Sequence, residues 1–304
     1  MSELHPTVSV VMITYNHENY IRQAIEGVLM QKTLFRYELI IGEDCSTDKT
    51  RQICFEYKNK YPDQIKLLLP QTNQGIMQNF YSTLRESNGK YVALCEGDDY
   101  WTDPFKLQKQ VDFLEANEEY SLCFHKVNVK YEDNLKDEGI LHYFEEREYS
   151  GLEIYKEWII STCSVVFRNY RDLLFHKSII YCDIYLFLLL SERGKIFGLG
   201  FDGATYRRNI NGASVTVSPK LVRRLYYQYK YMFYRFPKYK SISKEQTNYY
   251  FDNLINRPYY AGSFKFRFLC MCKTPRKIFS KYFFRSFPFL LKDMNSYFHK
   301  IIKF

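Results

Sequence analysis

Acidic and polar side chains follow three apolar runs of this sequence, at the points where those runs end. Thr14–Asn16 follow the first run, Glu43 and Asp44 end the second, and Glu96–Asp99 follow the fourth. Carboxylates gathered in one place would repel one another unless a cation compensates their charge. A hard divalent ion with oxygen ligands does this, and it would also neutralise a bound diphosphate. The residue types therefore indicate metal and phosphate chemistry, provided that the fold brings them together.

Taken singly, each group would be an ordinary polar loop or helix cap, the role that we assign to Asp48 and Asp103. Neither a P-loop pattern nor GxGxxG follows the first apolar run. Phosphates are therefore expected to be held through metal rather than by a glycine-rich loop. Gly97 allows a tight backbone turn between Glu96 and Asp98.

The elements that must position these residues are strand–helix units in the first half of the chain. The predicted strands are Val8–Ile13, Tyr37–Ile41, Ile65–Leu69 and Tyr91–Cys95. The predicted helices are Tyr20–Met30, Thr47–Lys60, Ile76–Glu86 and Pro104–Asn117. Near-continuous apolar strands in such units imply a Rossmann-like α/β fold, a mostly parallel sheet flanked by helices on both faces. Ligands bind at the carboxyl ends of such strands, where the polar groups would gather.

The pattern after Tyr120 is less regular. Strands are predicted at Tyr120–Val129, Thr162–Phe167, Lys195–Leu199 and Ala204–Arg207, a helix at Ile184–Ser191, and an exposed loop region at Asn134–Ser150.

Composition changes sharply near Ser218 and Pro219. The segment from Lys220 to Phe304 contains 19 Lys and Arg residues against 3 Asp and Glu, together with 25 of the 54 Tyr and Phe residues. This step predicts a domain at 1–218 and a basic, aromatic helical extension at 219–304. Met1–Thr7 is polar and no uncharged apolar run is long enough to span a bilayer. We therefore expect a cytoplasmic protein.

Three ordered motifs resemble those of glycosyltransferase family 2. They are Val8–Asn16 (VSVVMITYN), Ile41–Thr50 (IGEDCSTDKT) and Glu96–Trp101 (EGDDYW), and the resemblance covers about residues 7–210. The family has the GT-A fold and transfers sugars from nucleotide diphosphates, commonly with inversion. The resemblance therefore implies a nucleotide-sugar donor, most simply a UDP-sugar, and a divalent metal, Mn²⁺ or Mg²⁺.

Site roles come from the same resemblance, position by position. Thr14 and Tyr15 are expected to hold the nucleotide base, and Asp44 resembles the carboxylate that hydrogen-bonds it. Glu96–Asp98 resembles the DXD motif, with Asp98 as the metal ligand and Glu96 near the ribose or metal. Glu stands where the motif has its first Asp, which leaves the contact of Glu96 open.

An inverting transfer also needs a carboxylate that removes the proton of the acceptor hydroxyl. Asp183 occupies the matching place at the start of a predicted helix and is the candidate base, although it could equally cap that helix. Asp99 either assists the sugar or metal or caps the following turn. Trp101 either stacks on an acceptor sugar or belongs to the core, and Arg207 pairs with phosphate or with a core carboxylate. Asn209 stands where many relatives carry His.

The partners of the basic extension stay open at this stage. Mixed cations and aromatic rings suit an anionic membrane surface, where a lipid-linked or glycan acceptor would be found at the inner face. Packing on the catalytic domain is the plainer alternative, and nucleic acid is the least expected partner. Two rival functions are a sugar-phosphate nucleotidyltransferase and a non-catalytic membrane- or RNA-associated protein. We expect instead a glycosyltransferase that builds a cell-surface polysaccharide.

Overall fold

A computed structural model describes residues 5–132, 139–208 and 219–256 of the chain. The chain divides into two compact units, residues 1–210 and 211–304, which are described here separately. The predicted extension begins where helix α7 begins, at Pro219, and its residues 257–304 lie outside the described part.

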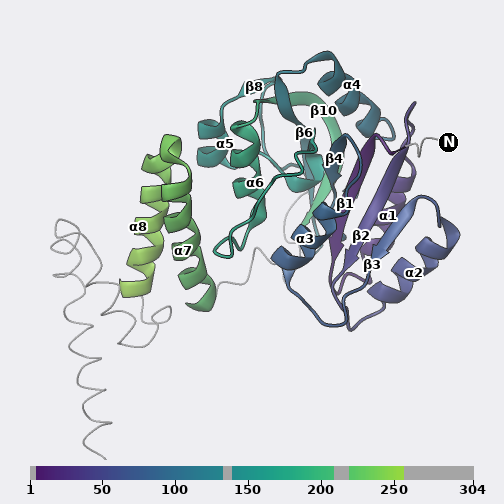
Figure 1. Ribbon diagram of the computed structural model, residues 1–304, viewed down its shortest axis with the longest axis horizontal. Helices are drawn as coiled ribbons and strands as arrows, with labels where there is room; N and C mark the ends of the chain where they lie inside the picture. The colour runs from purple at the N-terminus through teal and green to yellow at the C-terminus, as the bar shows by residue number, and fades with distance from the viewer. Residues whose placement is uncertain (1–4, 133–138, 209–218, 257–304) are drawn as a thin grey trace, which may run out of the picture. The chain divides into compact units, whose positions relative to one another are not determined.

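The first unit is built on a ten-stranded sheet whose first four strands are parallel, in the spatial order β3-β2-β1-β4. Their bounds are Val8–Thr14 (β1), Tyr37–Glu43 (β2), Ile65–Leu68 (β3) and Tyr91–Leu94 (β4). Helices α1 and α2 cover one face of these strands and α3 the other (Figure 1), while α4 packs on later strands. The helix bounds are Ile21–Leu29 (α1), Thr50–Lys60 (α2), Ile76–Arg85 (α3) and Lys106–Ala116 (α4).

Continuous apolar runs place β1 and β4 in the interior. Every residue of β4 is buried, and so is every residue of β1 except Ile13, which is partly exposed. Burial on both sides is what a parallel sheet between two helical layers requires. The predicted α/β class and the strand–helix units of the first half are confirmed.

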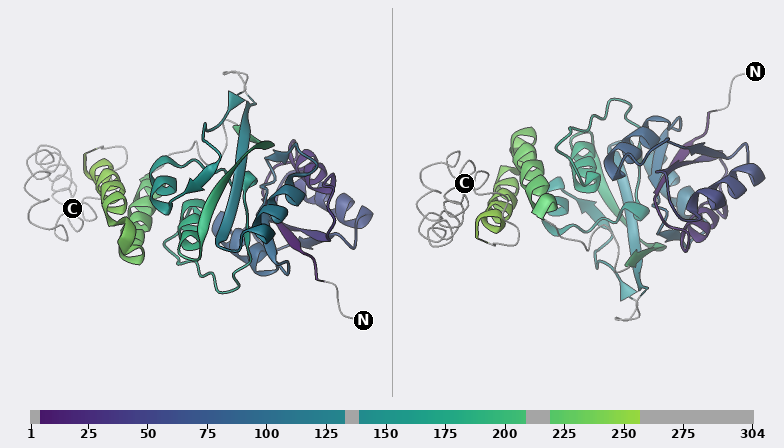
Figure 2. Two further views of the ribbon diagram at one scale, coloured as in Figure 1. Left: turned by 90° about the horizontal axis from the view of Figure 1, so that it is seen from above. Right: turned by 90° about the horizontal axis from the view of Figure 1, so that it is seen from below.

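The second half of the sheet is mixed, and its path continues β4-β9-β6-β10-β5. The long strands β6 and β10 run parallel to each other, and in Figure 2 β6 is the long teal strand. Antiparallel pairs join β9 to β4 and β6, and β5 to β10. The strand bounds are Tyr100–Trp101 (β5), Tyr120–Tyr131 (β6), Gly139–Ile140 (β7), Arg147–Tyr149 (β8), Val166–Arg168 (β9) and Lys195–Arg208 (β10). The helices are Gly151–Glu157 (α5), Thr162–Ser164 (a 3₁₀ turn) and Cys182–Ser191 (α6).

Three details differ from the pattern in the sequence. Strand β10 is continuous where two short strands are predicted, because register shifts between Leu199 and Ala204 absorb the irregular residues. The first residues of the strand predicted at Thr162–Phe167 form a 3₁₀ turn. Strands β7 and β8 lie inside the region predicted as a loop, where β7 pairs with β6 and β8 pairs with β10, both antiparallel.

The described part of the second unit is a helical hairpin. Helix α7 (Pro219–Arg235) and helix α8 (Lys240–Asn256) are joined by a 3₁₀ turn at Pro237–Tyr239. Tyr229 and Tyr250 stack at 5.3 Å between ring centroids, so aromatic rings hold the two helices together. Among the helices of the described segments, none combines the length and apolar character needed to cross a membrane.

A buried lysine lies in the core beside Trp101. The Lys106 side chain is fully buried, with Nζ 4.0 Å from the centroid of the Trp101 ring and hydrogen-bonded to Gln110 Oε1 at 2.8 Å. The Trp101 indole donates to the Cys163 carbonyl oxygen at 2.9 Å. Burial lowers the pKa of Lys106 from an ordinary 10.5 to about 8.

We expect Lys106 to make the free energy of unfolding depend on pH in alkaline solution. Between about pH 8 and 10.5 the unfolded chain binds a proton that the folded chain lacks, so stability rises with pH. Relative to Lys106→Met, the wild-type value should rise by about 2 kcal/mol from about pH 7.5 to 9.5, measured by urea denaturation. The value for Lys109→Met, a change on the exposed side of the same helix that leaves Lys106 in place, should rise with pH as the wild-type value does. Parallel curves for wild type and Lys106→Met would contradict the shifted pKa.

Candidate functional site at the carboxyl ends of the strands

Strand β1 brings the three polar groups together through its last two carbonyl oxygens. The Ile13 oxygen accepts from the Gly97 amide at 2.9 Å, and the Thr14 oxygen accepts from the Asp44 amide at 3.0 Å. In register, Thr14 lies opposite Glu43 on β2. The loops that follow β2 and β4 therefore begin on either side of the end of β1, at one edge of the sheet.

The loops after β1 and β2 are bonded to each other. The Asn16 amide donates to Ser46 Oγ at 3.0 Å, and Asn16 Oδ1 accepts from the Thr47 amide at 2.9 Å. Asn16 adopts a left-handed conformation with φ 55°, which Asn tolerates better than most residues. This turn leaves the Tyr15 ring 42% exposed, so it is available to a ligand.

Asp44 organises the loop that precedes α3. Its side chain is buried, and its two oxygens accept from the backbone amides of Gln74 and Gly75 at 2.7 and 2.8 Å. Its neighbour Glu43 is also buried and is bonded to Arg51. Glu43 is therefore paired with Arg51 inside the fold. Asp44, the next residue, instead fixes the loop at the edge of the site.

The acidic turn after β4 contains three carboxylates in different environments. Glu96 accepts from Thr162 Oγ1 at 2.7 Å, and burial together with the charge of Asp98 raises the pKa of Glu96 to about 7. Asp99 is buried, and burial raises its pKa well above the ordinary value, with Asp98 and Glu96 adding to the rise. Asp98 keeps a side chain that is 26% exposed. Asp98 and Glu96 are thus partly exposed, whereas Asp99 is buried, and of the two only Glu96 is hydrogen-bonded to Thr162.

Gly97 permits the close approach of this turn to β1. A Cβ atom there would lie 2.6 Å from Thr14 Oγ1 and 3.1 Å from His17 Nδ1. Both of these atoms are buried and have no hydrogen-bond partner in the described part of the chain. Thr14 thus lies at the site, with its hydroxyl against the acidic turn.

Arg207 fixes the acidic turn from β10. Its backbone amide donates to Asp99 Oδ1 at 2.9 Å, and its guanidinium donates to the Asp98 carbonyl oxygen at 2.9 Å. The same guanidinium is bonded to Gln23 and forms an ion pair with Glu132 at 2.9 Å. Its side chain is 3% exposed, so Arg207 lies inside the protein as a clamp on Asp98 and Asp99.

Trp101 also lies inside the protein rather than on the rim. Its side chain is 2% exposed and is bonded through its indole to the carbonyl of Cys163. Asn209 lies outside the described residues.

Asp183 lies in the first turn of α6. The rest of that helix is apolar and buried from Ile184 to Leu190, which anchors its first turn in place. Burial raises the pKa of Asp183, and its Oδ1 has no hydrogen-bond partner among the residues that the structure describes. The charge of Asp183 also contributes to the raised pKa of Glu96, which puts the two carboxylates in one neighbourhood.

His17 is a site residue that reasoning from the sequence missed. Its Nε2 lies 3.8 Å from Asp98 Oδ2. The available signal was its position, directly after the polar group that ends β1.

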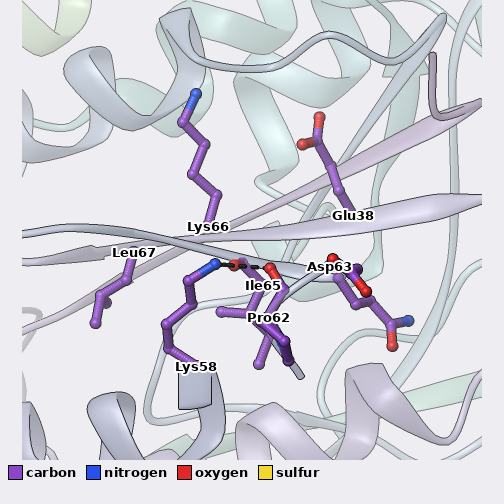
Figure 3. A pocket seen from close by; sticks show the side chains of 8 residues that line it. Glu38, Lys58, Pro62, Asp63, Ile65, Lys66 and Leu67 are labelled. Atoms are coloured by element: carbon purple, nitrogen blue, oxygen red, sulfur yellow. Dashed lines mark hydrogen bonds between the residues drawn. The ribbon is translucent and has the colours of Figure 1, made fainter. Parts of the chain in front are cut away.

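A separate pocket of about 370 Å³ lies at the other end of the strands (Figure 3). Glu38 and Ile65, near the amino ends of β2 and β3, line it. Lys58 lies there with its ammonium bonded to the carbonyl oxygens of Pro62 and Ile65, both at 2.7 Å. Because ligands of such sheets bind at the carboxyl ends, this pocket is not the candidate site.

Comparison with known proteins decides the family. The sequence model of Glycosyl transferase family 2 matches residues 9–178, more than half of the chain. The chain belongs to glycosyltransferase family 2. An uncharacterized protein of Mycobacterium tuberculosis is 42% identical over 208 residues, 67% of this chain and 60% of that protein. TuaG of Bacillus subtilis, named as a teichuronic acid biosynthesis glycosyltransferase, is 36% identical over 114 residues, 38% of this chain and 44% of TuaG. The chain thus matches less than two thirds of the length of these family relatives.

Solved structures agree with the family at the level of the fold. S. aureus TarS residues 1–349 in complex with UDP-GlcNAc has a TM-score of 0.62 at 19% identity, covering 89% of this chain and 77% of that one. The complex of the same protein with UDP has a TM-score of 0.60 at 18% identity, covering 89% and 76%. The chain therefore has the GT-A fold that the sequence motifs implied.

A divalent cation is the group that a family 2 glycosyltransferase implies at such a site. In the described ranges, no three His, Cys, Asp or Glu side chains are grouped so that they could hold a metal by themselves. Asp98 offers one accessible carboxylate. This donor set fits a cation such as Mg²⁺, which takes one or two carboxylates and completes its shell with substrate phosphates and water.

We expect Arg207→Ala to destabilise the protein by about 2 to 3 kcal/mol, because it removes the guanidinium that pairs with Glu132 and bonds to the Asp98 carbonyl oxygen and Gln23. Urea denaturation measures the change. The exposed neighbour Arg208→Ala is the matched control and should change stability by less than about 0.5 kcal/mol. A similarly small effect at both positions would contradict the role of Arg207 as a clamp.

Proposed function

We propose that this protein transfers a sugar from a UDP-sugar to a hydroxyl group of a cell-surface glycan precursor, with inversion and with a divalent cation. The observation that carries the proposal is the pair of hydrogen bonds from the Asp44 and Gly97 amides to the end of β1. These bonds bring the loop that we assign to the nucleobase and the turn that we assign to the diphosphate to either side of one strand end. A nucleoside diphosphate could then contact both.

The donor is assigned from the residues around Asp44. The exposed Tyr15 offers an aromatic face for a nucleobase, and the loop bonded to Asp44 lies at the same edge. TarS, which shares the fold, is seen with UDP and with UDP-GlcNAc. We therefore choose uracil as the base.

Asp183 is assigned as the base of the transfer. Its carboxylate takes the proton of the acceptor hydroxyl while the hydroxyl oxygen bonds to the anomeric carbon and the bond from that carbon to the diphosphate breaks. Burial raises the pKa of Asp183, which makes its carboxylate a stronger base than an exposed one, and Oδ1 has no other described partner. A cation held beside Asp98 would offset the charge that develops on the departing diphosphate.

The acceptor class is assigned from relatives. TuaG carries teichuronic acid biosynthesis in its name, and GgaA of Bacillus subtilis, 28% identical over 162 residues, is named a minor teichoic acid biosynthesis protein. A cell-wall polysaccharide precursor is therefore the acceptor that we propose.

Asp183→Asn should lower turnover about 10²- to 10⁴-fold and leave UDP binding unchanged, because it removes a base without touching the nucleotide. Turnover is measured as UDP release from a panel of UDP-sugars, and binding by calorimetry with UDP and Mn²⁺. Asp172→Asn, an exposed carboxylate paired with Arg193, is the matched control.

Two results would contradict this function. If Asp183→Asn turns over as fast as the wild type, Asp183 is not the catalytic base. If UDP binding needs neither Mn²⁺ nor Asp98, the reaction does not use a cation held at Asp98. A nucleotidyltransferase would instead release pyrophosphate from a nucleoside triphosphate and a sugar phosphate.

We also propose that residues 219–304 form an extension that meets an anionic membrane surface. Exposed residues of α7 recur at the spacing of one helical face, and we call this set the α7 stripe: Lys220, Arg224, Tyr227 and Tyr234. Cations beside exposed tyrosines suit the interface of an anionic bilayer. A lipid-linked acceptor would be presented at such a surface.

The double variant Lys220→Glu/Arg224→Glu should weaken binding to anionic vesicles about tenfold or more, since each cation near such a surface contributes about 1 kcal/mol. Vesicle co-sedimentation at low salt measures it, with neutral phosphatidylcholine vesicles as the reference. Lys60→Glu/Arg85→Glu, two exposed cations of the first unit, should leave binding unchanged. Equal binding by both double variants would show that the α7 stripe makes no membrane contact.

A further inference from the structure

We propose that His17 is a second protein ligand, beside Asp98, of the divalent cation that accompanies the donor diphosphate. This inference rests on the proposed function, and it assigns a role to a residue outside the three motifs of the family resemblance. The two side chains come from the loops after β1 and β4 and meet at the carboxyl edge of the sheet.

The distance between the two donor atoms suits a shared cation. Nε2 of His17 and Oδ2 of Asp98 are 3.8 Å apart, which is too long for a direct hydrogen bond. Two donors each about 2.1 Å from one ion lie roughly 3.0 Å apart at a right angle and roughly 4.2 Å apart on opposite sides. The observed separation falls inside that span, so neither residue needs to move far to bind one ion.

The backbone around His17 is fixed before any ion binds. The His17 amide donates to Thr50 Oγ1 at 2.7 Å, and its carbonyl oxygen accepts from the amides of Tyr20 and Ile21, both at 2.9 Å. The imidazole therefore stands at the start of α1 on an anchored backbone. Its side chain is 23% exposed, comparable to the 26% of Asp98, so both are open to a small ligand.

The other ring nitrogen of His17 fits the same role. A coordinating histidine normally donates its second N–H to an acceptor, which fixes the tautomer that leaves the first nitrogen free for metal. His17 Nδ1 is buried and without a partner among the described residues, and so is Thr14 Oγ1. Both atoms flank Gly97, at 3.1 and 2.6 Å from where its Cβ would be, so a hydroxyl lies near the nitrogen that would carry that proton, although the two atoms form no hydrogen bond in the structure.

The donor pair has a consequence for the kind of metal. Carboxylate and phosphate oxygens suit Mg²⁺ and Mn²⁺ alike, whereas imidazole favours transition metals. A site with one carboxylate and one imidazole should therefore prefer Mn²⁺ to Mg²⁺. His17 would set that preference, while Asp98 would support both ions.

The test is binding of Mn²⁺ and of Mg²⁺ to the full chain in the presence of UDP, by calorimetry, for wild type, His17→Ala and His17→Gln. We expect Mn²⁺ affinity to fall about tenfold or more in both variants and Mg²⁺ affinity to change less than about threefold. Pulsed electron paramagnetic resonance of the wild-type complex should show the ¹⁴N coupling of a bound imidazole, which both variants lose. His5→Ala, an exposed histidine away from the site, should keep affinity and coupling.

Mn²⁺ affinity within about twofold of wild type in both folded variants, or no ¹⁴N coupling in the wild type, would overturn the role of His17. That failure differs from failure of the proposed function. If His17 is not a ligand, UDP-dependent Mn²⁺ binding persists and still requires Asp98. If the wild type binds UDP equally well without Mn²⁺, both the role of His17 and the proposed metal-dependent function are wrong.

Discussion

The site depends on the end of β1 and on the two amides that bond to it. Strand β1 lies between β2 and β4, so its last two carbonyl oxygens face the loops that follow both neighbours. The Asp44 and Gly97 amides donate to those oxygens. The register of the central strands therefore determines how far apart the two loops lie. A shift of one residue in this pairing would turn the polar side chains to the other face. The α/β core thus determines where chemistry can occur.

Crowded carboxylates at this edge cost free energy that the rest of the fold offsets. Burial raises the pKa of Glu96, Asp99 and Asp183, which means that their charged forms are disfavoured. Arg207 compensates part of this cost by bonding to Asp99 and to the backbone of Asp98. A bound cation would offset more of this free-energy cost. The clustered carboxylates that destabilise the fold therefore favour binding of a metal with its diphosphate.

The elements of the first half could be predicted because their signals are local. Apolar runs predict β1 to β4, and the polar groups after them predict the edge at which Asp44 and Asp98 lie. Roles set by distant contacts could not be predicted in the same way. The burial of Trp101 depends on a carbonyl 62 residues away, and the clamp of Arg207 depends on a turn more than 100 residues earlier. The sequence does not link His17 to Asp98, because the two residues follow different strands.

A crystal structure of the complex with UDP and Mn²⁺ would show whether one nucleotide spans the end of β1. We predict that it does, with its base at Tyr15 and the loop held by Asp44, and with its diphosphate and the ion at Asp98. Nucleotide bound elsewhere, for instance in the pocket beside Lys58 at the amino ends of β2 and β3, would contradict it.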